Sequence, residues 1–231
     1  FTTPAMVSGA VMDALQAAEL AGVSLQVNNV ALQVQSDGDG LYSMRGLMPG
    51  NYTLTASANG YMRQIVTFSV GYGTNLTRNF NLVSLPDDGQ FRIVVNWNGS
   101  PSDLDAHLWL PPTNPAHLSK DNLGDIASDT VRAEVNLTNA NGYGPEVITL
   151  APTLFPGKYI FAVYMNAAPD YFVNTKARVT VYEGSTFLGE YKVPSTGVGH
   201  WWKVFTLDGT TRKLSTSGAN FITDSYPAPY R

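Results

Sequence analysis

Residues 91–109 read Phe-Arg-Ile-Val-Val-Asn-Trp-Asn-Gly-Ser-Pro-Ser-Asp-Leu-Asp-Ala-His-Leu-Trp, with two β-prone runs on either side of a turn rich in Gly, Ser and Pro. Residues 142–146, Gly-Tyr-Gly-Pro-Glu, add a glycine-rich turn that ends in a carboxylate. Short apolar runs separated by such turns are typical of antiparallel β structure. The two segments therefore predict one end of a β-sandwich at which acidic side chains converge.

The acidic side chains of these segments are candidate metal ligands. Asp103 and Asp105 are two residues apart, so both point to the same face if they lie on a strand. Glu146, Asp125 and Asn141 add further oxygen atoms if the loops fold together. Clustered carboxylate and amide oxygens suit Ca²⁺, which we therefore expect as the cofactor. In the alternative interpretation, the two aspartates only cap a turn by accepting hydrogen bonds from main-chain N–H groups.

The composition favours β structure along the whole chain. The 231 residues include 21 Gly, 14 Pro and 12 Tyr, and only 14% are charged, which is typical of many short strands joined by tight turns. The net charge of −4 has the wrong sign for binding the phosphate backbone of nucleic acids. Cys is absent, which excludes disulfides and thiolate metal sites. No apolar run approaches the ~20 residues that span a bilayer.

The strand pattern has one clear break. Residues 85–89, Leu-Pro-Asp-Asp-Gly, predict a domain boundary. We expect an all-β chain of two tandem antiparallel β-sandwich domains, residues 1–86 and residues 87–231, the second being a larger sandwich or jelly roll. In the second domain, residues 111–130 predict a long loop and the tail from Thr210 an extended segment. Its strands are expected at residues 91–97, 104–110, 131–137, 147–150, 158–164, 176–182, 187–193 and 201–207.

The first domain carries the pattern of a known family. The matching segments are Val7-Ser-Gly-Ala-Val-Met-Asp13, Leu20-Ala-Gly-Val-Ser-Leu25, Asp37-Gly-Asp-Gly-Leu-Tyr-Ser43, Gly46-Leu-Met-Pro-Gly-Asn-Tyr-Thr-Leu-Thr55 and Ala58-Asn-Gly-Tyr61. They resemble the carboxypeptidase regulatory-like domain over residues 6–84. The resemblance implies a transthyretin-like sandwich of seven strands that serves as an accessory or spacer module in secreted and cell-surface proteins. It also implies a loop at residues 14–20, despite their helical propensity. We interpret Asp37 and Asp39 as turn residues rather than Ca²⁺ ligands.

The second domain is similar to the YfaP-like family, an uncharacterised domain of exported bacterial proteins and multidomain surface proteins. The resemblance rests on Val95-Asn-Trp97, Ser102-Asp-Leu-Asp-Ala-His107, Gly142-Tyr-Gly-Pro-Glu-Val-Ile-Thr149, Pro156-Gly-Lys-Tyr159, Ala177-Arg-Val-Thr-Val-Tyr182 and Trp202-Lys-Val-Phe205. Two features depart from the family pattern. Ala106 replaces a usual Leu, and the aspartates that often precede the Gly-Tyr-Gly-Pro-Glu turn are here Glu134, Asn136, Asn139 and Asn141.

Aromatic side chains are candidate ligand contacts, because the flat face of an aromatic ring matches the apolar face of a sugar. We select Trp109, Tyr143 and Trp202, together with His107, which follows Asp105 by two residues. Trp201 and Trp202 are adjacent and must face opposite sides of a strand. In the alternative interpretation, these rings only fill the sandwich core.

No catalytic motif is found, and the spacing of the three histidines fits no compact zinc motif. We therefore expect a non-enzymatic binding or structural module of an extracellular, periplasmic or cell-surface protein, with a glycan or a protein as its ligand. We also expect it to be part of a larger multidomain protein. One alternative is an accessory region of a secreted hydrolase whose catalytic domain lies outside this chain. A further alternative is a hydrolase that uses Asp103, Asp105, His107 and Glu146.

Overall fold

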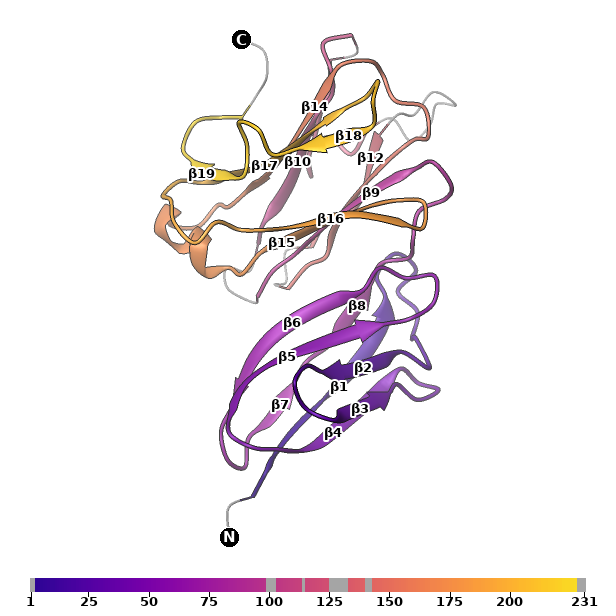
Figure 1. The fold of residues 1–231 in the computed structure, drawn as a ribbon, viewed down its shortest axis with the longest axis vertical. Helices are drawn as coiled ribbons and strands as arrows, with labels where there is room; N and C mark the ends of the chain where they lie inside the picture. Colours follow the sequence, from indigo (N-terminus) through magenta and orange to yellow (C-terminus); the bar gives the residue numbers. More distant parts are fainter. Residues whose placement is uncertain (1–2, 99–102, 114, 125–132, 140–142, 228–231) are drawn as a thin grey trace. The chain divides into compact units, whose positions relative to one another are not determined.

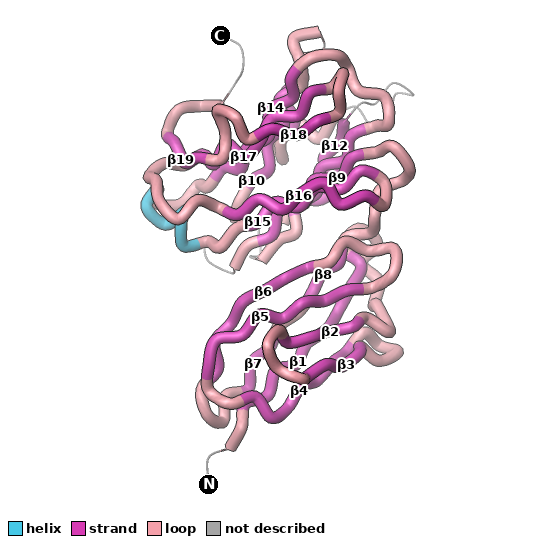
Figure 2. Tube along the Cα trace, in the orientation of Figure 1, coloured by secondary structure: helices cyan, strands magenta, loops and turns pink. Residues whose placement is uncertain are grey.

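The computed structural model describes residues 3–98, 103–113, 115–124, 133–139 and 143–227. The chain forms two compact units, Phe1–Leu85 and Pro86–Arg231. Strands dominate both units, and the single helical segment among the described residues is the short 3-10 helix η1 (Pro169–Asn174) (Figure 2). The predicted all-β fold class is confirmed. Within the described ranges, no helix has the length and apolar character needed to cross a bilayer.

The first unit is a sandwich of two sheets (Figure 1). One sheet has the order β4-β1-β7, with β8 also paired to β1, and the other has the order β3-β2-β5-β6. Strands β7 and β8 run parallel to β1, so this sheet is mixed. The prediction of a purely antiparallel first domain is therefore wrong for this sheet. The strands are β1 (Ala5–Asp13), β2 (Ser24–Val27), β3 (Leu32–Gln35), β4 (Leu41–Leu47), β5 (Gly50–Ser57), β6 (Gln64–Val70), β7 (Asn75–Thr77) and β8 (Phe80–Leu82).

The turns of the first unit behave as their sequences predict. Asp37 accepts hydrogen bonds from the main-chain N–H groups of Asp39 and Leu41, at 3.1 and 2.8 Å. These bonds satisfy its carboxylate within the hairpin turn. The residues that follow β1 form a turn rather than a helix, because Ala17 has a positive φ of 53° and the N–H group of Asp13 donates a hydrogen bond to the carbonyl oxygen of Ala18.

The second unit is a larger sandwich. One sheet has the order β12-β13-β9-β15-β16, and the other has the order β11-β10-β14-β17-β18, with β19 also paired to β17. The strands are β9 (Phe91–Asn96), β10 (Asp105–Trp109), β11 (His117–Leu118), β12 (Ala133–Leu137), β13 (Glu146–Leu150), β14 (Lys158–Tyr164), β15 (Arg178–Glu183), β16 (Thr186–Lys192), β17 (Trp201–Asp208), β18 (Lys213–Ser215) and β19 (Phe221–Thr223).

The core of the second unit lies between these two sheets. It is filled by alternate residues of the strands, such as Leu108, Phe161 and Trp202, none of which exposes more than 1% of its surface. Because side chains alternate along a strand, the residues between them point to the outer face. There Trp109, Ile160, Ala162 and Trp201 form a second apolar cluster.

Two loop predictions need correction. The predicted long loop at residues 111–130 contains the short strand β11, which pairs with the end of β10. The tail from Thr210 is not simply extended, since β18 and β19 both pair with β17. Isolated two- and three-residue strands have too little periodicity to be recognised in sequence.

The core assignment can be tested with two valines of the second unit. Val204 is fully buried, whereas Val198 is 63% exposed. We expect Val204→Ala to lower the free energy of unfolding by about 2–3 kcal/mol, because it removes buried methyl groups and leaves a cavity. Val198→Ala should change it by less than about 0.5 kcal/mol. Urea unfolding of both variants measures the difference, and equal effects would contradict the assigned core.

Candidate metal site on the second unit

The alternation of strand β10 positions the two aspartates. Leu104 and Ala106 are both buried in the core, with at most 1% of their surface exposed. Asp105 lies between them and therefore points to the outer face of the sheet, as do His107 and Trp109 further along the strand. The two aspartates are thus held at the start of the strand by the apolar side chains that alternate with them.

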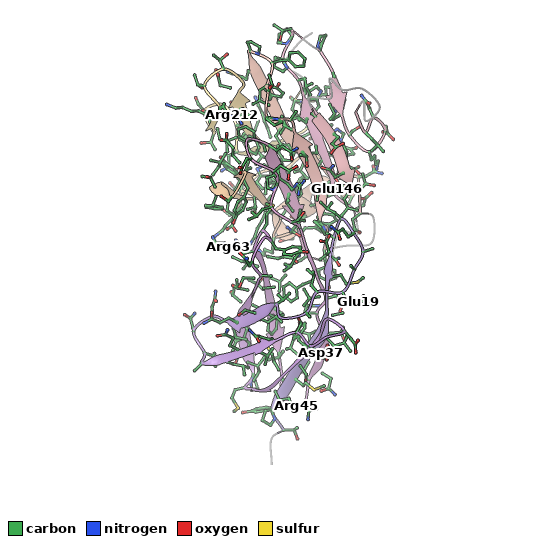
Figure 3. The ribbon with its side chains drawn as sticks, turned by 90° about the vertical axis from the view of Figure 1, so that its right-hand side faces the viewer. Glu19, Asp37, Arg45, Arg63, Glu146 and Arg212 are labelled. Atoms are coloured by element: carbon green, nitrogen blue, oxygen red, sulfur yellow. The ribbon has the colours of Figure 1, made fainter. Side chains whose placement is uncertain are left out.

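The Gly-Tyr-Gly-Pro-Glu turn positions the third carboxylate. Tyr143 and Gly144 have positive φ angles of 67° and 74°, and the Gly144–Pro145 peptide bond is cis. A Cβ atom on Gly144 would lie 2.7 Å from the carbonyl oxygen of Val95 and 2.8 Å from the ring of Trp97. Glycine is therefore required here for both conformation and space. The turn ends at Glu146, the first residue of β13 (labelled in Figure 3).

The structure brings the three carboxylates together. One oxygen atom from each of Asp103, Asp105 and Glu146 lies within 4.8 Å of the others. Asp105 and Glu146 expose only 3% and 2% of their surface, and Asp103 is half-buried. Asp125 and Asn141, the other two predicted ligands, lie outside the described residues. This convergence of acids is the candidate functional site.

The hydrogen bonds in the site leave part of its charge unpaired. Glu146 accepts a short hydrogen bond from the N–H group of Ala106 and a longer one, of 3.4 Å, from the N–H group of Asn139. The Nζ atom of Lys120 lies 2.8 Å from Oδ2 of Asp105 and 3.6 Å from Oδ2 of Asp103. The other oxygen of Asp105, Oδ1, is buried and has no hydrogen-bond partner.

The pKa values show that negative charge is costly in this site. Burial raises the pKa of Glu146 to about 8, and the charges of Asp105 and Asp103 act in the same direction. Burial also raises the pKa of Asp105, although Lys120 opposes this shift. The hydrogen bond to Asp105 raises the pKa of Lys120. A positive ion placed among the carboxylates would favour their ionised forms.

The donor set fits a hard divalent cation. Ca²⁺ takes six to eight oxygen ligands, and carboxylates bind it through one or both oxygens. Asp103, Asp105 and Glu146 provide only oxygen donors, and Oδ1 of Asp105 has no competing partner. Water or main-chain carbonyl oxygens would have to complete the coordination.

A band of aromatic rings continues along the outer face of the same sheet. The ring of His117 stacks on Trp109 at 4.4 Å between centroids and 4° between planes. Its Nε2 atom lies 2.8 Å from Nδ1 of His107. The ring of Tyr226, from the C-terminal segment, contacts Trp109 and Trp201 edge-on at 5.4 and 5.2 Å. These five residues (His107, Trp109, His117, Trp201 and Tyr226) are called the aromatic face below.

The predicted ligand-binding residues occupy different positions. His107 and Trp109 belong to the aromatic face, and Tyr143 is 41% exposed on the turn before Glu146. Trp202 is completely buried in the core, and its Nε1 atom donates a hydrogen bond to Asn220. The prediction that Trp202 contacts a ligand is therefore wrong.

The sequence analysis did not identify three residues of this region. The predicted loop supplies Lys120 and His117, and the tail supplies Tyr226. Only their contacts with Asp105 and Trp109 place them beside β10. The lysine follows the histidine by three residues, but this spacing has no specific signal in a loop. Their roles follow from the pairing of β11 with β10 and from the course of the tail.

The first unit is similar to a known family of domains. Residues 6–83 match the family model of the carboxypeptidase regulatory-like domain, as the sequence predicts. No curated protein matches the chain.

Several solved structures share a limited likeness with the chain. A cohesin–X-dockerin complex from Acetivibrio cellulolyticus is 16% identical, covers 35% of this chain and 58% of its own, and has a TM-score of 0.30. This chain therefore spans less than two thirds of that protein. SAV2460, of unknown function, is 18% identical over 60% of this chain and 91% of its own, with a TM-score of 0.44. BcpA, the major pilin subunit of Bacillus cereus, is 10% identical over 82% of this chain and 67% of its own, with a TM-score of 0.32. Such weak likenesses carry no argument about function.

The raised pKa of Glu146 predicts how stability depends on pH without a cation. In the unfolded chain, Glu146 loses its proton near its ordinary pKa of 4.5. In the folded chain it keeps this proton until the pH approaches its raised pKa of about 8. The free energy of unfolding should therefore fall as the pH rises through this window. Glu146→Gln should flatten the fall, because glutamine is neutral and can still accept the bond from Ala106. Urea unfolding in EDTA measures the profile.

Glu19→Gln is the control, because Glu19 is exposed in the first unit. This variant should keep the wild-type pH profile. A Glu146→Gln profile as steep as that of the wild type would show that Glu146 does not hold a proton in the folded chain.

Proposed function

We propose that the second unit is a non-enzymatic, Ca²⁺-stabilised binding module of an exported or cell-surface protein. The observation that carries the proposal is the convergence of Asp103, Asp105 and Glu146, with one oxygen of each within 4.8 Å of the others. A bound cation would tie the start of β10 to the turn before β13. It would thereby fix one rim of the sandwich.

A comparison within the chain supports this proposal. Asp13 in the first unit is as buried as Asp105, with 2% against 3% of its surface exposed. Asp13 accepts hydrogen bonds from two main-chain N–H groups and from the hydroxyl of Tyr61, so both of its oxygens are used. Asp105 has one lysine partner and an unpartnered oxygen. Buried carboxylates are normally satisfied, so Oδ1 of Asp105 is available to coordinate a cation.

The chemistry of His107 argues against hydrolysis at this site. Burial is the main cause that lowers its pKa to about 3, and His117 and Lys120 lower it further. A general base works best when its pKa lies near the working pH. Furthermore, the nitrogen partner of His107 is His117 rather than a carboxylate that would orient it for catalysis. These features favour binding over catalysis.

The aromatic face is the surface on which we expect a glycan or protein ligand. Tyr226 is its outermost ring and is 46% exposed, whereas Trp109 and Trp201 beneath it expose only 5% and 8%. A ligand would therefore stack first on Tyr226.

The first unit supports the exported setting, because carboxypeptidase regulatory-like domains are accessory modules of secreted proteins. We further propose that residues 91–208 are a YfaP-like domain.

Thermal unfolding tests the cation. Addition of Ca²⁺ to protein prepared in EDTA, at about 100 times the dissociation constant, should raise Tm by roughly 5–10 °C, because the ion binds only the folded chain. Asp103→Asn should reduce the rise, since it removes a charged ligand from a half-buried position. Asp224→Asn, which changes an exposed aspartate of the same unit that contacts His200, should keep it. An identical Tm with EDTA and with Ca²⁺ in the wild type would refute the proposal.

A glycan array tests the ligand. We expect binding that Tyr226→Ala weakens by about tenfold, because stacking on an exposed ring is lost. Tyr72→Ala is the matched control, since Tyr72 is 54% exposed but lies in the first unit. Equal binding by the two variants would remove the aromatic face from the proposal, and absence of any glycan signal would favour a protein ligand.

A further inference from the structure

We infer that Lys120 is an internal competitor for the cation, a tethered ammonium group that a divalent ion must displace and that sets the affinity of the site. The inference rests on the proposed cation site and adds a residue that regulates it. Lys120 would have two roles of opposite sign. It would stabilise the cation-free protein and weaken cation binding.

The geometry makes the two positive charges mutually exclusive. The Nζ atom of Lys120 lies 2.8 Å from Asp105 and 3.6 Å from Asp103, so it contacts two of the three carboxylates that form the site. A Ca²⁺ ion would need carboxylate oxygens at about 2.3–2.6 Å. An ion that bound both aspartates would therefore lie in the space of the ammonium group. One of the two must leave.

The loop that carries Lys120 is held in place, whereas its side chain can leave. Ser119 and Asn122 bond each other through their main chains in both directions, at 3.0 Å. The side chain of Asn122 also donates a hydrogen bond of 2.8 Å to the carbonyl oxygen of His117, which stacks on Trp109. The Lys120 side chain is 42% exposed. It can therefore swing into solvent without rearranging the loop.

The charge balance explains why displacement can be favourable. One ammonium group lies against two carboxylates, those of Asp105 and Asp103. A divalent cation brings twice the charge of lysine and can contact all three carboxylates of the site at once. The displaced ammonium group regains its hydration because it is already half exposed. The lysine thus lowers cation affinity without blocking the site.

Lys120→Met tests this inference, because methionine is also unbranched but has neither a charge nor an oxygen ligand. Calorimetric titration with CaCl₂ should show a dissociation constant that is lower than that of the wild type by on the order of tenfold, since a charge-assisted hydrogen bond no longer competes. In EDTA, the same variant should have a lower Tm, because the carboxylates lose their internal counter-charge. The two measurements should therefore change in opposite directions.

Three further variants complete the test. Lys120→Arg keeps the charge and should have an affinity near that of the wild type. Lys213→Met changes an exposed lysine on β18 by the same chemistry and should alter neither measurement. Lys120→Gln replaces Lys120→Met if the latter does not fold, and it should also bind Ca²⁺ more tightly than the wild type.

The outcomes separate this inference from the proposed function. Binding by the wild type with equal or weaker binding by the neutral variants Lys120→Met and Lys120→Gln would overturn the inference and leave the cation site in place. Binding only by the neutral Lys120 variants would overturn both the proposed function and the inference that an ion displaces Lys120, since the lysine would then exclude the ion from the wild type. No binding by any variant would overturn the proposed function and this inference with it.

Discussion

The burial of two carboxylates at the starts of β10 and β13, which belong to the two different sheets, is the constraint on which the rest of the second unit depends. Leu104 and Ala106 must enter the core, so Asp105 between them must point outward beneath the loop of Lys120. Glu146 begins β13, in which all five residues are buried. Removing a carboxylate from water costs free energy unless partners replace the lost hydration. The turns and loops around these strands provide those partners only in part.

The two units solve the same problem differently. In the first unit, turn amides satisfy Asp37, and amides together with a tyrosine hydroxyl satisfy Asp13, so each aspartate stabilises its own turn. In the second unit, Asp105 depends on a single lysine from a distant loop and keeps an unpartnered oxygen. The first arrangement suits a spacer that needs no ligand. The second suits a module whose rim is completed from outside.

The sequence predicts those parts of the site that depend on local geometry. The spacing of Asp103 and Asp105 and the Gly-Tyr-Gly-Pro turn were enough to indicate that the acids converge, because both are set within a few residues of the strand ends. Strand alternation also predicts that Trp201 and Trp202 face opposite sides. It does not tell which side is core, and both are buried, since Tyr226 from the tail covers the outer one.

Lys120 and His117 escaped prediction for a physical reason. Their positions depend on the pairing of β11 with the far end of β10, a contact of only two residue pairs inside a loop without periodicity. Such a contact is decided by the whole fold rather than by local propensity. Strand alternation has a similar limit. It places Trp201 and Trp202 on opposite faces of β17, but only the rest of the fold decides that Trp202 enters the core and that Tyr226 covers Trp201.

The outer face of β10 joins charge and aromatic surface on one strand. Asp105, His107 and Trp109 follow one another on this face at intervals of two residues, and β11 lies beside them with His117 on Trp109. Lys120 extends from the same loop to Asp105. The neutral histidine pair separates the acids from the tryptophans, so the apolar surface is not interrupted by an unpaired charge. A cation at the acidic end would therefore stabilise the strand that carries part of the aromatic face.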